Sequence, residues 1–181
     1  MEGGVDLLRA AATGDEAAVR RFVDEVGPVV YGFVFARVGG DEAAAADLVQ
    51  ETFLEAVRSA SGYRGDAALS TWVCAIARRR LARHYERERR QDVARHGLTV
   101  LHGDGEPAGA DAGDELDRRD EVVRALGELS PLHRQVLVLK YLDGDSVEEI
   151  AAALQKSRVQ VQSLLQRARA GLRRALEPGR G

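Results

Sequence analysis

Two helix-start signals only eleven residues apart constrain the last third of this chain more than any other feature. Ser146 with Glu149, and Ser157 with Gln160, have the spacing of capping boxes. Only one short helix fits between the two starts. The segment 146–169 therefore predicts two helices joined by a tight turn. The apolar residues that would share one core are Ile150, Ala151, Leu154, Val161, Leu165 and Ala168.

Such a pair is typical of a helix-turn-helix, whose second helix enters the major groove of DNA. An ordinary helical hairpin with solvated charges is the alternative interpretation. The charge distribution favours DNA, because residues 122–181 carry a net charge of +4 although the whole chain carries −3. The candidate DNA contacts of the second helix are Ser157, Arg158, Gln160, Gln162, Ser163, Gln166, Arg167 and Arg169.

Apolar residues recur at helical spacing along nearly the whole chain, and strand signals are almost absent. The sequence therefore predicts an all-α protein. The expected helices are 5–12, 15–37, 41–60, 70–90, 115–128, 131–142, 146–154 and 158–176. Glycines, a proline and carboxylates crowd residues 103–114, which cannot bury a core. We expect a domain at 1–92, a flexible acidic linker at 93–121 and a helix-turn-helix domain at 122–177.

Local signals mark where several of these helices begin. Thr13 and Asp15 compete as N-caps of the helix at 15–37. Asp41 follows a pair of glycines and is expected to cap the helix at 41–60. Ser130 stands before Pro131, which suits the first position of a helix because that position needs no N–H.

The helix expected at 41–60 carries different chemistry on two sides. One side can be buried and comprises Leu48, Phe53, Ala56 and Val57. The other is acidic and polar with one apolar residue, since steps of three, four and seven align on a helix; it comprises Asp47, Gln50, Glu51 and Leu54. This second side suits docking to a basic partner, and a solvated face is the ordinary alternative.

A run of arginines follows in the next helix. Residues 78–90 hold seven arginines and two glutamates, a net charge of +5 over 13 residues. This density favours phosphate contacts, because the arginines repel one another without a partner. Basic side chains mixed with aromatic ones can also hold a single strand, although Trp72 fits a core position equally well. The candidate contacts are Tyr63, Arg64, Trp72, Arg78, Arg79, Arg80, Arg83 and His84.

Three separate segments resemble the extracytoplasmic-function (ECF) group of bacterial sigma factors, in the sigma-70 family. Residues 47–54, Asp-Leu-Val-Gln-Glu-Thr-Phe-Leu, are similar to that family's core-polymerase-binding helix. Residues 63–65, 70–73 and 76–78 resemble its promoter-opening segment. Residues 129–137, 141–144 and 148–151 resemble its C-terminal domain. The segments follow the family's order and cover nearly the whole chain except the linker.

The resemblance implies a transcription initiation factor that binds core RNA polymerase and directs it to specific promoters. Segment 63–90 would recognise the minus-ten element and help to melt its upstream edge, and helix 158–169 would enter the major groove of the minus-thirty-five element. The linker would thread through polymerase channels. The β flap is a further expected contact, and an anti-sigma factor is a candidate partner because such factors often inhibit family members. The residues that would contact the β′ clamp helices are Asp47, Leu48, Gln50, Glu51 and Leu54.

The chain departs from the family pattern at several positions. Arg79 and Arg83 stand where asparagine and aspartate are usual. The usual Gly-Thr-Val-Lys-Ser-Arg of the recognition helix is Val-Gln-Val-Gln-Ser-Leu at 159–164, so two basic positions hold Gln162 and Leu164. Two lost phosphate contacts would lower the salt dependence of binding by about two units of slope, while glutamine can still bind adenine. Gln155 replaces a usual glycine, which disfavours a left-handed turn.

Other functional classes fit the sequence less well. The histidines at 84, 96, 102 and 133 are scattered, and no nucleophile has a paired base, so we expect no enzyme, cofactor or metal. Cys74 lies in an apolar run and predicts a buried, inert thiol. No signal peptide or membrane-spanning run is present, so we expect a cytoplasmic protein without membrane insertion. Two alternatives stay open: a sigma-like interaction protein with weak or altered DNA recognition, and a stand-alone helix-turn-helix repressor.

Overall fold

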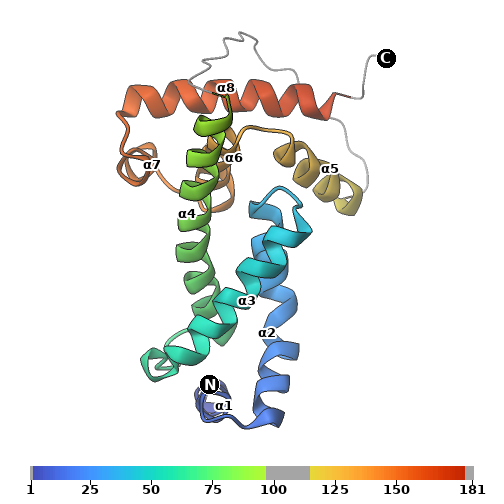
Figure 1. Cartoon of the computed structure of the whole chain (residues 1–181), viewed down its shortest axis with the longest axis vertical. Coiled ribbons are helices and arrows are strands. Elements are labelled where there is room, and N and C mark those ends of the chain that lie inside the picture. Colours follow the sequence, from blue (N-terminus) through green and yellow to red (C-terminus); the bar gives the residue numbers. More distant parts are fainter. Residues whose placement is uncertain (1, 97–114, 178–181) are drawn as a thin grey trace. The chain divides into compact units, whose positions relative to one another are not determined.

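The computed structural model describes residues 2–96 and 115–177, and within these ranges the chain is helical without a strand (Figure 1). Its α-helices are α1 (Glu2–Ala12), α2 (Glu16–Arg37), α3 (Glu42–Arg58), α4 (Leu69–His96), α5 (Glu115–Gly127), α6 (Pro131–Leu137), α7 (Val147–Leu154) and α8 (Arg158–Leu176). A 3-10 turn, η1 (Ala60–Gly62), precedes α4, and a π-helical turn, η2 (Val138–Leu142), continues α6. The predicted all-α fold is confirmed. The chain divides into two compact units, Met1–His84 and Tyr85–Gly181.

Aspartates start the two long helices of the first unit. The side chain of Asp15 accepts a hydrogen bond from the amide of Ala18 at 3.0 Å, and Asp41 accepts one from Ala44 at 2.9 Å. Each bond satisfies an amide that has no partner inside the helix. Asp41 is thus confirmed as a cap. Asp15 caps α2 in preference to Thr13, whose hydroxyl donates to a backbone carbonyl at the end of α1 instead.

The core of the first unit turns one side of α3 toward solvent. Helices α1, α2 and α3 pack together, and α4 adds a buried apolar side. Phe22 of α2 meets Phe53 of α3 edge-on, with ring centroids 4.9 Å apart. This contact and the buried Leu48 orient α3, so that its acidic side stays outside. Fully or almost fully buried side chains of this core include Leu8, Phe22, Val30, Leu48, Val73, Ile76 and Leu81.

The second unit contains the helix pair that the capping boxes predict, joined by a short turn (Figure 1). Both boxes form. The amide of Ser146 donates to Glu149 Oε2 at 2.7 Å, and the amide of Ser157 donates to Gln160 Oε1 at 2.8 Å. Each serine hydroxyl accepts the amide of its partner in return. The shared core holds Leu126, Val136, Leu137, Ile150, Ala151, Leu154, Val161, Leu164, Leu165 and Ala168.

Some boundaries differ from expectation. The helix expected at 70–90 continues to His96, and the helix expected at 131–142 divides into α6 and η2. Ser130 occupies the N-cap position of α6, but its side chain makes no capping hydrogen bond. Most of the predicted linker, residues 97–114, lies outside the described residues, and its described ends at 93–96 and 115–121 are helical. No helix in the described ranges combines the length and apolar composition that crossing a membrane requires.

Candidate functional site

One side of α3 presents polar and acidic groups to solvent. Asp47 and Gln50 are exposed, and Leu54 is 50% exposed beside them. These three, with Glu51, are here called the α3 face. The predicted burial of Leu48 is confirmed, because the residue is only 2% exposed, and this corrects the other expectation, that Leu48 contacts a partner directly. Its position falls on the opposite, core-facing side of the helix, from which it supports the α3 face.

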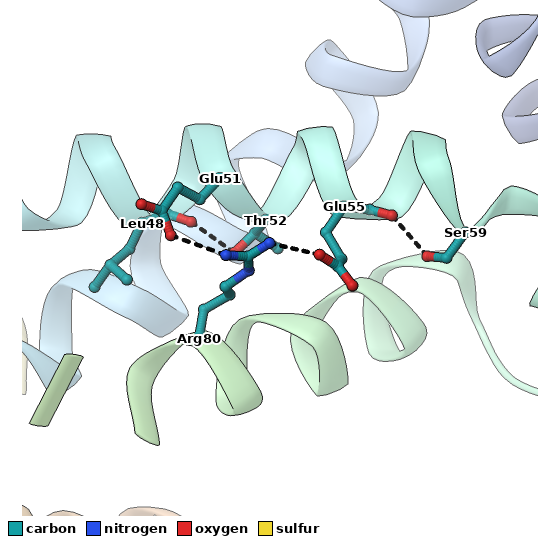
Figure 2. A network of polar contacts seen from close by, with 6 residues as sticks. All are labelled: Leu48, Glu51, Thr52, Glu55, Ser59 and Arg80. Atoms are coloured by element: carbon teal, nitrogen blue, oxygen red, sulfur yellow. Dashed lines mark hydrogen bonds and ion pairs between the residues drawn. The ribbon is translucent and has the colours of Figure 1, made fainter. Parts of the chain in front are cut away.

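Arg80 of α4 reaches two carboxylates on successive turns of α3 (Figure 2). Its guanidinium donates from Nη1 to Glu51 Oε2 at 3.2 Å and from Nη2 to Glu55 Oε2 at 2.5 Å. Only 22% of the Arg80 side chain is exposed. Arg80 was predicted to contact DNA, and the structure instead places it in a bridge between helices. The bridge also neutralises Glu55, an acidic residue that stands four positions after Glu51.

Tyr63 likewise belongs to the fold rather than to an open surface. It is 7% exposed, and its hydroxyl donates to the carbonyl of Ala67 at 2.7 Å. Its ring lies against that of Trp72, with centroids 5.3 Å apart, and Trp72 is half-buried. The predicted contact between Tyr63 and a base is therefore corrected, since the ring is already packed. The core interpretation of Trp72 fits this arrangement.

The DNA contacts predicted for the first unit lie along α4 and just before it. Arg64, Arg78, Arg79 and Arg83 are exposed, and His84 is half-buried. Their helix is held by Val73, Ile76 and Leu81 on its other side. The four exposed arginines lie on the protein surface, where phosphates have access to them.

Cys74, on the same helix, is half-buried. Burial raises the pKa of its thiol above the ordinary value, against the opposing effect of the nearby Arg37 and Arg78. The neutral thiol is favoured, and a neutral thiol is a poor nucleophile. This agrees with the prediction of an inert cysteine.

The turn between α7 and α8 keeps a left-handed residue although no glycine is present. Gln155 has φ 53° and ψ 46°, and it is the one non-glycine residue with positive φ within 2–96 and 115–177. The amide of the next residue, Lys156, donates to the carbonyl of Ala151 at 2.9 Å and closes the turn. The expected conflict between glutamine and this backbone is thus a local strain that the surrounding helices tolerate.

Helix α8 divides sharply into a buried and an exposed side. Val161, Leu164, Leu165 and Ala168 are buried in the shared core. Gln162, Ser163 and Gln166 are exposed, together with Arg158 and Arg169, and Arg167 is half-buried. Two of the predicted DNA contacts also have a structural role, because the side chains of Ser157 and Gln160 bond to each other's backbone in the capping box.

Two positions of α8 that are usually basic in the family pattern hold uncharged residues here, and they lie on different sides of the helix. Gln162 is exposed, whereas Leu164 is 6% exposed and packs in the core. A phosphate therefore has access only to position 162. The expected drop of two units in salt slope is reduced to about one unit by this geometry, because the slope counts phosphate contacts.

The positive charge of α8 also acts on α6. His133 is half-buried. Burial lowers the pKa of its imidazole, and the nearby Arg167 and Arg174 lower it further. His133 therefore favours the neutral form.

Sequence reasoning overlooked one exposed residue of α8. Val159 is 74% exposed, the highest value among the exposed large apolar side chains of the described residues. It stands seven residues before Gln166 and so lies on the same side of the helix. That spacing was the available signal, but a search for polar DNA contacts does not select a valine.

Comparison with known proteins places both units in one family. The model of sigma-70 region 2 matches residues 22–91, and that of sigma-70 region 4 matches residues 119–172. The ECF RNA polymerase sigma factor SigK of Mycobacterium ulcerans is 33% identical over 178 residues, covering 94% of this chain and 92% of that protein. The ECF sigma factor BldN of Streptomyces coelicolor is 29% identical over 173 residues; the match covers 95% of this chain but 65% of that protein's length.

One solved structure, CnrH in complex with the cytosolic domain of CnrY, covers 96% of each chain at 29% identity and a TM-score of 0.43. The family assignment depends on the two sequence models and on SigK, whose match extends over almost the full length of both proteins. The chain therefore belongs to the sigma-70 family, in the ECF group of alternative sigma factors that direct RNA polymerase to promoters.

Proposed function

We propose that the first unit of this sigma factor binds both polymerase and DNA, whereas the second unit binds DNA. The α3 face docks on the β′ clamp helices of core RNA polymerase. The exposed arginines of α4 contact the upstream edge of the minus-ten element, and α8 enters the major groove of the minus-thirty-five element.

The α3 face supports the polymerase part of this proposal. Asp47 and Glu51 supply negative charge, and Leu54 adds an exposed apolar contact. Complementary charge guides association, and an apolar residue at the centre of a contact adds affinity. Arg80 pairs with Glu51, but 42% of the Glu51 side chain remains exposed, so this carboxylate stays accessible to a basic partner.

The observation that carries the DNA part is the segregation of charge on α8. The helix contains five arginines between Arg158 and Arg174 and no carboxylate. Its polar side is exposed, and its apolar side is buried in a helix-turn-helix core. A surface of this kind attracts phosphates from both sides of a groove and leaves its centre for bases.

Transcription with purified components tests the proposal. Core RNA polymerase and the full chain are mixed with genomic fragments, and the 5′ ends of the transcripts are sequenced. We expect transcripts that start at defined sites preceded by two shared upstream elements. An absence of promoter-dependent transcripts over many templates would overturn the proposal.

Charge reversal separates docking from folding. Asp47→Lys is expected to weaken binding to core polymerase by about tenfold, because Asp47 is exposed. Glu51→Lys is a poorer choice, since it also breaks the bond to Arg80. Asp24→Lys, which reverses an exposed charge on α2, is the matched control and should bind normally. Equal loss in both variants would contradict docking through the α3 face.

A double variant tests the DNA contacts of the first unit. Arg79→Ala combined with Arg83→Ala removes two exposed cations from α4. Formation of the open promoter complex should fall more than binding to core polymerase, because only the former needs the DNA contacts. Equal loss of both activities would indicate misfolding instead.

A second candidate function has a specific observation in its favour. The exposed position 162 of α8 holds glutamine where the family usually has a basic residue. A sigma-like protein that binds polymerase or an anti-sigma partner but recognises DNA weakly would show this loss of charge. Normal core binding without promoter-dependent transcripts would support it, and competition between core polymerase and the partner would locate the shared face.

A further inference from the structure

The centre of the exposed side of α8 combines an apolar residue with a hydroxyl and an amide. Val159 is 74% exposed, and Ser163 and Gln166 are exposed at four and seven residues further on. Steps of four and seven keep these side chains on one line of the helix. The line lies opposite the buried Val161, Leu164, Leu165 and Ala168. It is therefore the part of α8 that projects furthest from the core of its unit.

Arginines stand on both sides of this central line. Arg167 follows Ser163 by four residues on one side, and Arg158 and Arg169 lie on the other. The nitrogen Nε of Arg167 donates to the carbonyl of Ser163 at 3.3 Å, and that of Arg169 donates to Leu165 at 3.2 Å. These bonds hold the arginine stems along the helix. Flanking cations with an uncharged centre match a groove, whose phosphates lie at the edges and whose bases lie between.

Neighbouring candidates on α8 are less available for base contacts. Ser157 and Gln160 are occupied by the capping box, in which Ser157 N donates to Gln160 Oε1 at 2.8 Å. Arg158 pairs with Glu148 of α7 at 2.7 Å. Val159 and Gln166 have no comparable role within the described part of the fold, and a base can approach them in their present positions.

The chemistry of these two side chains selects particular base edges. A valine can neither donate nor accept a hydrogen bond, and thymine is the one base that presents a methyl group in the major groove. A glutamine amide both donates and accepts, which matches N7 and the N6 amino group of adenine. The two residues are about 10 Å apart along the helix axis, so they meet different base pairs.

We propose that Val159 is a specificity-determining residue that packs against a thymine methyl group, with Gln166 on an adenine nearby, so that the minus-thirty-five element of this sigma factor contains A·T pairs at both positions. The proposal rests on the proposed entry of α8 into the major groove. It adds the class of base pair that the helix selects.

The inference is tested by selecting the DNA duplexes that the protein binds and then removing single methyl groups from them. Holoenzyme made from core RNA polymerase and the full chain selects duplexes from a random library. Each thymine of the enriched upstream element is then replaced by deoxyuridine, which removes only the methyl group. We expect one position at which this replacement weakens binding about fourfold, the effect of one buried methyl-sized group.

Variants assign the effect to the residue. Val159→Ala should bind the thymine and deoxyuridine duplexes equally, because the contact is then absent from both. Alanine favours a helix, so α8 is kept. The matched control Val122→Ala, at an exposed position of α5, should keep the fourfold preference. Gln166→Ala should likewise abolish sensitivity to 7-deaza-adenine at one adenine.

The outcomes separate this inference from the proposed function. If an upstream element is enriched but no thymine in it responds to deoxyuridine, the assignment of Val159 is overturned and the sigma-factor function stands. The assignment is equally overturned if Val159→Ala keeps the full preference. If no element is enriched by the holoenzyme, the proposed function fails, and the assignment fails with it.

Discussion

Helices α4 and α8 both carry rows of arginines, yet the fold uses the two rows differently. On α4, Arg80 is drawn inward by Glu51 and Glu55 of α3 and is mostly covered. On α8, Arg158 pairs with Glu148 of α7, and both side chains remain more than half exposed. Exposed pairs of this kind contribute little stability. The number of arginines on a helix therefore does not by itself identify a DNA-binding surface. Carboxylates on the neighbouring helix decide which of the arginines remain exposed.

The largest effect is expected from a charge placed on the buried side of α8. Leu164→Arg puts a cation into a position that is 6% exposed. We expect it to destabilise the second unit by at least about 3 kcal/mol, from lost packing and a buried charge. Hydrogen exchange of the α8 amides in the full chain measures this. Near-normal protection would mean that α8 rotates to expose the arginine, which would contradict its division into two sides.

The bridge between α3 and α4 supplies the next largest effect. Arg80→Ala leaves Glu51 and Glu55 as neighbouring like charges, and we expect the first unit to lose about 1 kcal/mol. Urea unfolding followed by the fluorescence of Trp72 reports on this unit. Arg79→Ala, which removes an exposed arginine of the same helix, should leave stability unchanged. Identical unfolding curves for the two variants would show that Arg80 is not structural.

The left-handed turn of the second unit offers a stabilising change. Gln155→Gly relieves the strain of φ 53° in a non-glycine residue, although glycine also makes the unfolded chain more flexible. We expect a net gain of about 0.5 kcal/mol in the second unit. Exchange protection in α7 and α8 should rise together. A loss of protection would show that the side chain of Gln155 makes a contact worth more than the strain.

A charge added on the exposed side of α8 should change DNA binding but not folding. Gln162→Arg adds a cation at an exposed position, and the salt dependence of promoter binding should steepen by about one unit of slope. Filter binding of the holoenzyme at several salt concentrations measures the slope. An unchanged slope would place position 162 away from the phosphates.

The smallest effect concerns pH and the imidazole of His133. Burial and the α8 arginines lower its pKa in the folded chain, so below about pH 6.5 the unfolded chain binds more protons than the folded one. Stability of the second unit is therefore complete above that pH and falls as the pH drops toward the lowered pKa. Hydrogen exchange of α6 between pH 5 and 7, corrected for the intrinsic rate, should show this fall. His133→Gln should flatten it.

Local signals predicted the second unit well. Both capping boxes form with the predicted partners, and the six apolar residues expected to share a core all lie in it. Caps and helical spacing act over a few residues, so they can be recognised without knowledge of the fold. The same spacing also placed Asp47, Gln50 and Leu54 on one exposed side of α3.

Contacts between distant residues escaped sequence reasoning. The bond from Arg80 to Glu55 joins residues 25 positions apart. Helical spacing sets Arg80 in line with the buried Val73 and Ile76, but it cannot name a carboxylate partner on another helix. Tyr63 is buried because its ring meets Trp72. Such pairings depend on how two helices cross and on which turn of each faces the other.

The sequence alone determined where helices begin, which side of each is apolar and which family the segments resemble, because these depend on neighbours within one or two turns. Tertiary structure decided which polar and aromatic groups remain on the surface. Burial and ion pairing between helices withdrew Tyr63 and Arg80 from it, while the core beneath α8 turned Val159 outward. Spacing within one helix predicts which side is polar, but the packing of neighbouring helices decides which residues of that side stay exposed.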